Sequence, residues 1–256
     1  MIRTLKARFH QGHRTMLWPD GPAPELPATF RGVPTVDASK CPKGCRECAE
    51  VCPTDAISIG PSVTVDLGRC LFCPECERSC PEGAIRYSRD YRMATRTRDD
   101  LITGERELVL ANALDEKLLQ LFGRSLKLRQ VSAGGCSACE ADVNVLSTIG
   151  WDIGRFGIQV VASPRHADGI LVTGPVTENM RLALEKTWAA VPDPRIVIAL
   201  GACAISGGPY AGLPDQHDGV IGAVPVDLFV PGCPPHPLTI LDGMLRLLGR
   251  IEAGRS

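Results

Sequence analysis

The sequence predicts an α/β protein whose larger part is a doubly wound parallel sheet, with a smaller α+β part before it. Two observations carry this prediction. Strand-like and helix-like segments alternate over residues 126–256, and residues 37–95 contain a short, cysteine-rich internal repeat. Strands that alternate with helices form parallel sheets through crossover connections, whereas two short copies cannot each bury a core and must pack together.

Apart from its cysteines, the composition is that of an ordinary globular protein. The 256 residues are 44% hydrophobic and 22% charged, with a net charge of −1, which does not favour nucleic acid or an anionic membrane surface as a partner. No apolar run approaches the roughly 20 residues that span a bilayer, and the N-terminus lacks the apolar stretch of a secretory signal and a twin-arginine pair. We therefore expect a cytoplasmic protein. Because disulfides are rare there, its twelve cysteines indicate metal binding.

Residues 1–36 are rich in proline, glycine and arginine and show little periodicity, which predicts an extended N-terminal arm. Within it, Ile2, Leu5 and Phe9 would line one side of a short helix, with basic residues facing out. That pattern is compatible with a helix that docks on a partner or at a membrane interface. A solvated basic chain end is the alternative.

Residues 37–95 carry the repeat, in which CRECAEVCPTDAISI (45–59) aligns with CPECERSCPEGAIRY (73–87). Each copy is a cysteine run, a proline and a short β-rich stretch. The complete runs are Cys-x3-Cys-x2-Cys-x3-Cys-Pro from Cys41 and Cys-x2-Cys-x2-Cys-x3-Cys-Pro from Cys70. The second run has the bacterial ferredoxin spacing at every position, and the first has one extra residue.

This spacing predicts a bacterial-ferredoxin-like domain with two 4Fe–4S clusters whose ligands cross between the copies. Three closely spaced thiolates hold three corners of one cube, and the fourth, before a proline that turns the chain away, reaches the other cube. The first cluster is assigned Cys41, Cys45, Cys48 and Cys80. The second is assigned Cys52, Cys70, Cys73 and Cys76. The apolar side chains expected around the cubes are Ile57, Ile59, Val65 and Ile85. Structural zinc sites are the alternative, although a zinc ribbon needs only four thiolates.

Residues 96–125 are predicted to be a connector that ends in a helix over 108–122. Residues 126–256 form the predicted α/β domain, for which we expect a flavodoxin-like fold. Its strands are expected at 126–131, 158–162, 169–174, 195–201 and 226–232. Its helices are expected after Ser137, from Thr177 as the cap to Ala190, and over 236–251 as an amphipathic closing helix. The second helix would have Met180, Ala183, Leu184 and Trp188 on one face.

The four remaining cysteines all lie just past the carboxyl end of a predicted strand, the edge at which open α/β sheets gather their sites. They are Cys136, Cys139, Cys203 and Cys233. Glycines precede them and would let the backbone approach a cluster closely, namely Gly134, Gly135, Gly201 and Gly232. Four converging thiolates predict a third 4Fe–4S cluster, which accounts for all twelve cysteines. Four buried structural cysteines are the alternative.

Two stretches of the chain resemble known families. Residues 28–95, with LGRCLFCPECERSCPEGAIRYSRDYRMA around the second cysteine run, resemble the ferredoxin-type subunit of formate hydrogenlyase and of complex I. Residues 126–245 resemble the small subunit of energy-converting, group 4 [NiFe] hydrogenases, which is related to the cluster-bearing B subunit of complex I. The motifs are GGCSACEADV (134–143), RFGIQVVASPRHADGILVTGPVT (155–177), PDPRIVIALGACAISGG (192–208) and PVDLFVPGCPPHP (225–237). The Cys136-Ser-Ala-Cys139 spacing is similar to that of the hydrogenases, and here the two subunits are fused in one polypeptide.

The resemblance implies an electron-transfer subunit of a membrane-associated [NiFe] hydrogenase-type oxidoreductase. Two ferredoxin-type clusters would exchange electrons with a donor or acceptor protein. The third, proximal cluster would face the catalytic centre on a hydrogenase large subunit, which is similar to the complex I D subunit. Membrane-embedded, ion-translocating subunits would hold the complex on the inner face of the cell membrane.

The resemblance also implies roles for three polar residues. Glu140 would lie near the partner's active site and take part in proton transfer, and an exposed glutamate at a helix start is the alternative. Arg165 and His166 would lie near the third cluster, where a hydrogen bond would raise its potential, and plain structural roles are the alternative. Two other functions stay open, namely a complex I-like module that reduces quinone or another acceptor without hydrogen chemistry, and a self-contained electron carrier.

Overall fold

The computed structural model describes residues 2–12, 14–104 and 107–251, so parts of the predicted arm, connector and α/β domain (1, 13, 105–106 and 252–256) lie outside the described residues. Across the described ranges, no helix has the length and apolar character needed to cross a membrane. Besides the longer elements, the described residues form five short 3-10 helices, namely η1 (Ala38–Lys40), η2 (Asp99–Leu101), η3 (Ile153–Phe156), η4 (Pro164–His166) and η5 (Gly208–Tyr210).

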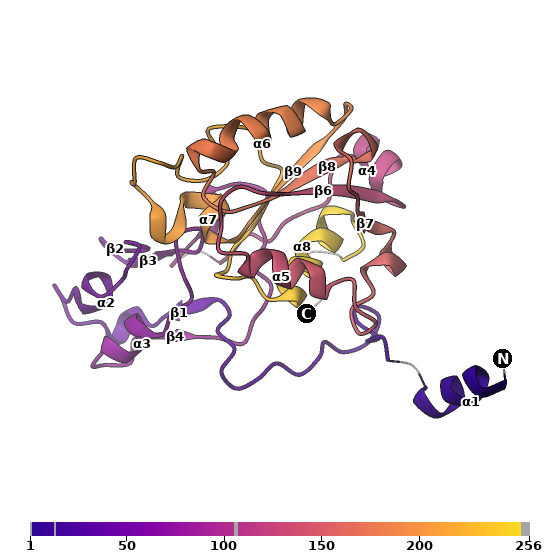
Figure 1. Cartoon of the computed structure of the whole chain (residues 1–256). Helices are drawn as coiled ribbons and strands as arrows, with labels where there is room; N and C mark the ends of the chain where they lie inside the picture. Colours follow the sequence, from indigo (N-terminus) through magenta and orange to yellow (C-terminus); the bar gives the residue numbers. More distant parts are fainter. Residues whose placement is uncertain (1, 13, 105–106, 252–256) are drawn as a thin grey trace.

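The centre of the molecule is a five-stranded parallel sheet in the order β10-β9-β8-β6-β7 (Figure 1). Its strands are β6 (Leu126–Ser132), β7 (Ile158–Val160), β8 (Gly169–Thr173), β9 (Ile196–Leu200) and β10 (Leu228–Val230). In chain order the strands lie 2-1-3-4-5, so the order reverses between β6 and β8. β8 and β9 are buried along their whole length because both faces of the sheet are covered. The predicted parallel α/β sheet is confirmed.

Helices cover both faces of this sheet. α6 (Glu178–Ala190) lies on one face, and α5 (Ala138–Val145) and α8 (Pro237–Leu247) lie on the other (Figure 1). The short α7 (Gly201–Ser206) leaves the carboxyl end of β9. Thr177 stands at the N-cap position of α6, but its hydroxyl makes no capping hydrogen bond. On the predicted apolar face of α6, Leu184 is buried and Met180 and Trp188 are half-buried, whereas Ala183 is exposed.

The closing helix differs from its prediction. An amphipathic helix was expected, but all eleven residues of α8 are buried. Its outer side is covered by segments from far away in the chain, since Trp18 of the arm and Leu114 and Phe122 of the connector share its apolar cluster. The backbone N–H of Leu114 also donates to the carbonyl of Leu247 at the end of α8 over 3.0 Å. α8 is therefore a core helix.

The predicted connector helix over 108–122 is wrong in its first half, because the observed α4 spans only Glu116–Phe122. The carboxylate of Asp115 accepts from the N–H of Leu118 over 3.0 Å and so caps the helix at this point. Upstream, the N–H of Ala111 donates to the carbonyl of Ala94 over 2.7 Å. The N–H of Ala111 thus bonds to a residue outside the connector segment and not to a carbonyl one helical turn earlier, so the segment is not helical there.

The cysteine-rich part is an α+β unit of two small antiparallel sheets and two short helices. One sheet pairs β1 (Pro34–Val36) with β4 (Ile85–Tyr87). The other has β3 (Val63–Asp66) between β2 (Ile57–Ile59) and β5 (Ile102–Thr103). The helices α2 (Glu47–Glu50) and α3 (Glu75–Ser79) pack on one another, as expected for the two copies. β1 comes from the arm and β5 from the connector, so both neighbours complete this unit.

The N-terminal arm has a free part and a bound part. α1 (Ile2–Gln11) projects from the body with no buried residue (Figure 1). Further along, Trp18 is buried, and the guanidinium of Arg155 donates to the carbonyls of Met16 and Trp18 over 2.5 and 2.6 Å. The predicted extended arm is therefore anchored on the α/β domain before it reaches the cysteine-rich unit.

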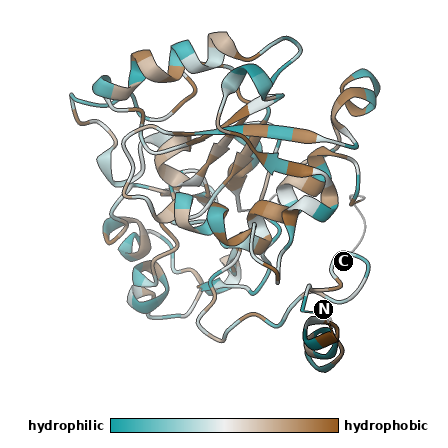
Figure 2. Ribbon diagram, turned by 45° about the vertical axis from the view of Figure 1, so that its right-hand side comes forward, coloured by the Kyte–Doolittle hydropathy of each residue, from teal (hydrophilic) through white to brown (hydrophobic). Residues whose placement is uncertain are grey.

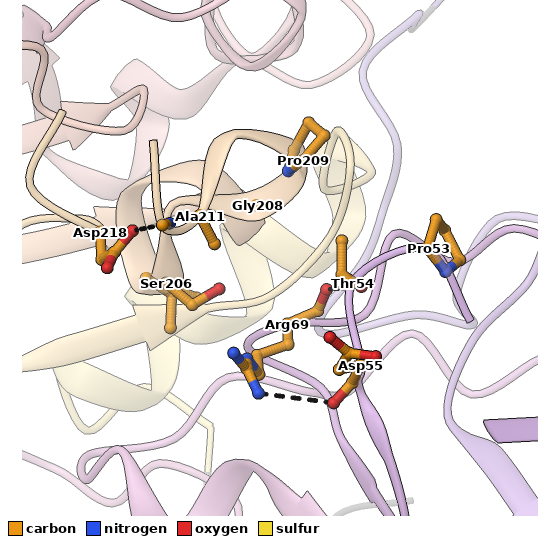
Figure 3. Close-up of a pocket in the computed structure, with 11 residues that line it drawn as sticks. Pro53, Thr54, Asp55, Arg69, Ser206, Gly208, Pro209, Ala211 and Asp218 are labelled. Carbon is orange, nitrogen blue, oxygen red and sulfur yellow. Dashed lines mark hydrogen bonds between the residues drawn. The ribbon is translucent and has the colours of Figure 1, made fainter. Parts of the chain in front are cut away.

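The cysteine-rich unit and the sheet share one continuous apolar cluster, which runs from Val65 and Leu101 through Ile205 to Val172. Figure 2 shows the hydrophobic residues concentrated in the central strands. Polar contacts close the edge of this junction, because the hydroxyl of Ser206 donates to the carbonyl of Gly68 over 2.8 Å. A polar cavity opens beside it, where Thr54, Asp55 and Arg69 face Ser206 and Asp218 (Figure 3).

Candidate functional site

Four cysteines from the two runs line one cavity beside α2. Cys41, Cys45 and Cys48 come from the first run, and Cys80 comes from the second. Cys48 lies on α2 and is buried, and Cys80 ends α3. Burial raises the pKa of the Cys48 thiol, and the neighbouring thiols raise it further. The apolar lining of this cavity is Val36, Val63, Ala84 and Ile85.

The other four cysteines of the repeat line a second cavity beside α3. They are Cys52 from the first run and Cys70, Cys73 and Cys76 from the second. Burial raises the pKa of the Cys70 thiol to about 12. The structure thus brings the eight cysteines together in the two crossed sets. Of the apolar side chains expected around the clusters, Ile57 and Val65 line this cavity and Ile85 lines the first, whereas Ile59 packs against the surrounding core.

Matching backbone hydrogen bonds reach the two crossing cysteines. The N–H of Ala56 donates to Sγ of Cys52 over 3.2 Å, and the N–H of Ala84 donates to Sγ of Cys80 over 3.2 Å. In each copy the donor lies four residues after the cysteine, just past the proline turn. Such bonds stabilise negative charge on sulfur, so the backbone of each copy would support a metal-bound sulfur at its crossing cysteine.

The second cavity receives additional donors. The N–H of Phe72 donates to Sγ of Cys70 over 3.3 Å. The hydroxyl of Tyr87 lies 3.6 Å from Sγ of Cys70 and 3.6 Å from Sγ of Cys76. Burial raises the pKa of Tyr87, and the two thiols raise it further, so the phenol keeps its proton. These donors are aimed at the cysteines of one cavity only.

A third group of cysteines lies at the carboxyl edge of the parallel sheet. Cys136 precedes α5, Cys139 lies on α5, Cys203 lies on α7, and Cys233 follows β10. Burial raises the pKa of Cys139, and the charges of the other three cysteines raise it further. Burial likewise raises the pKa of Cys203 to about 11, with contributions from Cys233 and Cys136. These mutual effects on the pKa place the four thiols close to one another at the sheet edge.

The glycines expected to admit a cluster differ in what they do. A Cβ on Gly201, whose φ is +87°, would lie 2.7 Å from Sγ of Cys139, so the backbone does approach a thiol closely there. At Gly134, Gly135 and Gly232, a Cβ would instead meet other protein atoms, such as the backbone of Pro235 in the case of Gly232. Of the four glycines, only Gly201 lets the backbone lie close to a thiol. The other three let the backbone lie close to other protein atoms.

The second group of cysteines lies next to both of the others. Cys76 of the second group raises the pKa of Cys48 in the first, and Cys73 of the second raises the pKa of Cys233 in the third. Phe72 and Cys233 also line one shared cavity. The second group therefore adjoins both of the others, and it is called the central group below.

The donor set fits iron–sulfur clusters. All twelve cysteines are free thiols. Burying several thiolates together raises their pKa values because each repels the next, and bound iron would supply the compensating positive charge. Within the described ranges, no three or more His, Cys, Asp or Glu side chains are arranged to hold one metal ion. A cubane presents four separate iron atoms, each with its own thiolate, so its ligands are spread more widely than those of a single ion.

Glu140 is held at the same sheet edge. Its Oε1 accepts hydrogen bonds from the hydroxyls of Ser132 and Thr173, each over 2.6 Å. Burial would raise its pKa, but these two donors lower it below the usual value. By contrast, Arg165 and His166 lie on η4 at the surface, and among the described residues neither donates to a cysteine sulfur. The expectation that they lie against the third group therefore has no support in these contacts.

Sequence reasoning missed several residues around the sites. Ser132 and Thr173 end two neighbouring strands, and the strand pattern alone offered no reason to couple them to Glu140. Tyr87 could have been found by comparing the two copies, because Ile59 stands at the equivalent position. His236 accepts from the N–H of Leu238 over 3.1 Å and caps α8, a role visible in the sequence only as its place before Pro237.

Comparisons with known proteins agree with this arrangement. The family of the NADH ubiquinone oxidoreductase 20 kDa subunit matches residues 136–247, and the 4Fe-4S dicluster domain family matches residues 40–84. A probable membrane-bound hydrogenase subunit of Pyrococcus furiosus is 40% identical over 141 residues, which cover 54% of this chain and 84% of the relative. The chain belongs to the 20 kDa subunit family.

Other members of the 20 kDa subunit family are similar to a comparable degree. Formate hydrogenlyase subunit 7 of Escherichia coli is 42% identical, and the match covers 55% of each chain, so the present chain spans only about half of that relative. An NADH-quinone oxidoreductase subunit of Symbiobacterium thermophilum is 33% identical over 61% of this chain and 90% of its own length. A chain in the structure of a membrane-bound sulfane sulfur reductase, an archaeal respiratory membrane complex, is 31% identical over 56% of this chain and 78% of its own, with a TM-score of 0.47.

Proposed function

We propose that this member of the 20 kDa subunit family is the electron-transfer subunit of a membrane-associated [NiFe] hydrogenase-type oxidoreductase. The observation that carries the proposal is the set of three four-thiol groups, of which two lie in the cysteine-rich unit and the third lies at the exposed carboxyl edge of the sheet. Cys136 and Cys233 are exposed at that edge. A site that ends on the surface suits contact with a catalytic partner.

Three 4Fe–4S clusters would occupy the three groups. The first would be held by Cys41, Cys45, Cys48 and Cys80, and the second by Cys52, Cys70, Cys73 and Cys76. The third, proximal cluster would be held by Cys136, Cys139, Cys203 and Cys233. Such clusters, when bound, take up and release single electrons. The chain itself supplies the thiolates, backbone donors toward sulfur and an apolar lining that excludes water.

We assign the parts of the chain to matching roles. Residues 1–36 are the arm, 37–95 the ferredoxin-like domain, 96–125 the connector and 126–256 the flavodoxin-like domain with the proximal site. The 2-1-3-4-5 strand order supports the flavodoxin-like assignment.

The expected partners are a large subunit that carries the nickel–iron site, membrane-embedded ion-translocating subunits and an electron donor or acceptor protein. The complex would sit on the inner face of the cell membrane. This part of the proposal is supported by the relatives named as hydrogenase subunits and by the Cys136-Ser-Ala-Cys139 spacing. Glu140, which is ionised and follows Cys139, would accept a proton at the face toward the large subunit.

A complex I-like module that reduces quinone or another acceptor is the second candidate. It is favoured by the match to the NADH ubiquinone oxidoreductase 20 kDa subunit family and by the relatives named as NADH-quinone oxidoreductase subunits. The two candidates differ in the partner, because only the hydrogenase partner would hold nickel.

The deciding experiment is the metal content of the protein isolated anaerobically with its co-purifying subunits. About twelve irons per chain, together with about one nickel in the large subunit and hydrogen-evolving activity, would support the hydrogenase. The same iron with no nickel, together with quinone reduction, would support the second candidate. Zinc in place of iron would overturn both.

A further inference from the structure

The two copies of the repeat allow an internal comparison between their thiol groups. β2 follows the first cysteine run, β4 follows the second, and both strands have a buried, an exposed and a half-buried residue in the same order. Ile57 and Ile85 occupy the buried position, and Ile59 and Tyr87 occupy the half-buried one. The copies therefore share a strand pattern but differ in whether a hydroxyl is present.

That hydroxyl reaches sulfur. Tyr87 Oη lies 3.6 Å from Sγ of Cys70 and 3.6 Å from Sγ of Cys76, and the phenol ring lines their cavity. The ring is held by Phe72, whose centroid lies 6.3 Å away at an interplanar angle of 46°. A thiolate bound to iron has no proton to give, so the phenol must be the donor in both contacts.

The first cavity lacks this donor. Ile59, the counterpart of Tyr87 in the first copy, carries no polar group and does not line the first cavity. Besides its cysteines, that cavity is lined by apolar side chains such as Val36 and Val63 and by the acidic residues Glu47 and Glu82, and none of its lining residues carries a hydroxyl group. Both copies keep the backbone donor to their crossing cysteine, over 3.2 Å in each case. The second cavity adds the N–H of Phe72 and the hydroxyl of Tyr87. The second site therefore has hydrogen-bond donors from Phe72 and Tyr87 in addition to the backbone donor that both sites share.

We propose that Tyr87 is a tuning residue that raises the reduction potential of the cluster at Cys52, Cys70, Cys73 and Cys76 above that of its partner in the repeat. A hydrogen bond to a cluster thiolate stabilises the more negative, reduced state. The favoured group is the central one, and Phe72, next to its Cys73 in the chain, lines one cavity together with Cys233 at the sheet edge. Tyr87 thus biases an electron toward the position next to the proximal site. This inference rests on the proposed cluster-binding function.

The test is the variant Tyr87→Phe in the full chain, with clusters incorporated anaerobically. The substitution keeps the ring on Phe72 and removes only the hydroxyl. Midpoint potentials of the clusters are measured by redox titration followed by electron paramagnetic resonance. We expect one of the two ferredoxin-type midpoints to shift to a more negative value, with the other two clusters unchanged. The control is Tyr91→Phe, which removes a hydroxyl that accepts from Trp18 and leaves the cysteine contacts intact.

A second readout is independent of the potential. Electron–nuclear double resonance in D2O should detect an exchangeable proton coupled to the central cluster in the wild type, and Tyr87→Phe should lose that coupling. Unchanged potentials and couplings in a variant that retains all its iron would overturn the tuning role. Loss of the central cluster from the variant would also overturn it, since Tyr87 would then be needed for assembly. Absence of clusters from the wild type would instead refute the proposed function.

Discussion

The carboxylate of Glu140 accepts a hydrogen bond from the buried hydroxyl of Thr173 over 2.6 Å. Ser132 donates to the same oxygen, so the last residues of β6 and β8 together hold the carboxylate at the sheet edge. The two bonds outweigh the effect of burial and lower the pKa of Glu140. Glu140 is therefore ionised at neutral pH and can accept a proton at this edge.

The first prediction concerns this carboxylate. In the assembled complex, Glu140→Gln should slow hydrogen turnover by about 10²–10⁴-fold, the usual contribution of a positioned acid or base. The amide can still accept from Ser132 and Thr173, so the iron content and the cluster spectra should stay unchanged. The matched control is Glu185→Gln on the exposed face of α6, where the carboxylate only pairs with Arg181. Wild-type turnover in Glu140→Gln would show that the residue has only a structural role.

The second prediction follows from the crossing of the cysteine runs. Cys52→Ser should alter the same cluster spectrum as Cys73→Ser, although Cys52 belongs to the first run. Likewise, Cys80→Ser should match Cys45→Ser. The two pairs lie in two different cavities, which is the physical reason for this outcome. Paramagnetic resonance of the four variants checks it, and pairing of Cys52 with Cys45 would contradict the crossed assignment.

The third prediction concerns the proximal site. Cys203→Ser should remove or convert only the third cluster. Complete removal would lower the iron content from about twelve to about eight per chain, since each cluster carries four irons, whereas conversion would change the spectrum of the third cluster and remove at most about one iron. The spectra of the two ferredoxin-type clusters should persist, because Cys203 lies on α7 and outside both of their cavities. Loss of all three spectra together would show that the cysteine-rich unit depends on the proximal site for its folding.

A pH dependence is expected from His236. Burial lowers the pKa of this imidazole below 6.5, and its Nδ1 must be unprotonated to accept from the N–H of Leu238. The folded-state pKa is thus below the unfolded value, so the capping contribution is complete above pH 6.5 and is lost as the pH falls through the folded pKa. The loss should be on the order of 1 kcal/mol, the typical worth of an N-cap.

The variant His236→Asn isolates this effect, because asparagine can cap a helix but does not titrate near neutral pH. Thermal midpoints of both proteins are measured anaerobically between about pH 8 and pH 5 to bracket the ordinary histidine range. The midpoint of the wild type should fall relative to that of His236→Asn as the pH falls. A difference that stays constant over this range would mean that His236 does not titrate in the folded state within it.

The last prediction concerns an ion pair in the core. Asp242 and Arg246 pair over 2.8 Å on α8 with side chains only 1% exposed, and burial raises the pKa of Asp242 despite its partner. Removing one partner, as in Asp242→Leu, should lower the free energy of unfolding by about 3–5 kcal/mol because the guanidinium of Arg246 stays buried but loses its ion pair with Asp242. Replacing both, with Asp242→Leu and Arg246→Met, should recover most of that loss in denaturant unfolding. Arg181→Met on exposed α6 is the control and should cost less than about 1 kcal/mol.

The sequence by itself determined the chemistry and the general fold of this protein. Cysteine spacing is a local property. In a run such as Cys70-x2-Cys73-x2-Cys76 the three thiols are close enough in the chain to bind one cluster together. The crossing of Cys52 and Cys80 follows from the proline turns for the same reason. Strand periodicity is local too, so the parallel sheet and the placement of cysteines at its edge were predictable.

The tertiary structure alone decided which distant segments meet. The amphipathic pattern of 236–251 did not reveal that Trp18 and Leu114 would cover α8 and turn it into a core helix. The helix α4 does not reach back to residue 108, because the N–H of Ala111 donates to the carbonyl of Ala94 instead of to a helical partner. The amphipathic pattern of the segment gives no sign of that contact. Three features of the sites were likewise decided by tertiary contacts. They are the closeness of the thiol groups, the hydroxyl donors to Glu140 and the contact of Tyr87 with sulfur. Each joins groups that are far apart in the chain or on separate elements, and only the packing of the whole core fixes their distances.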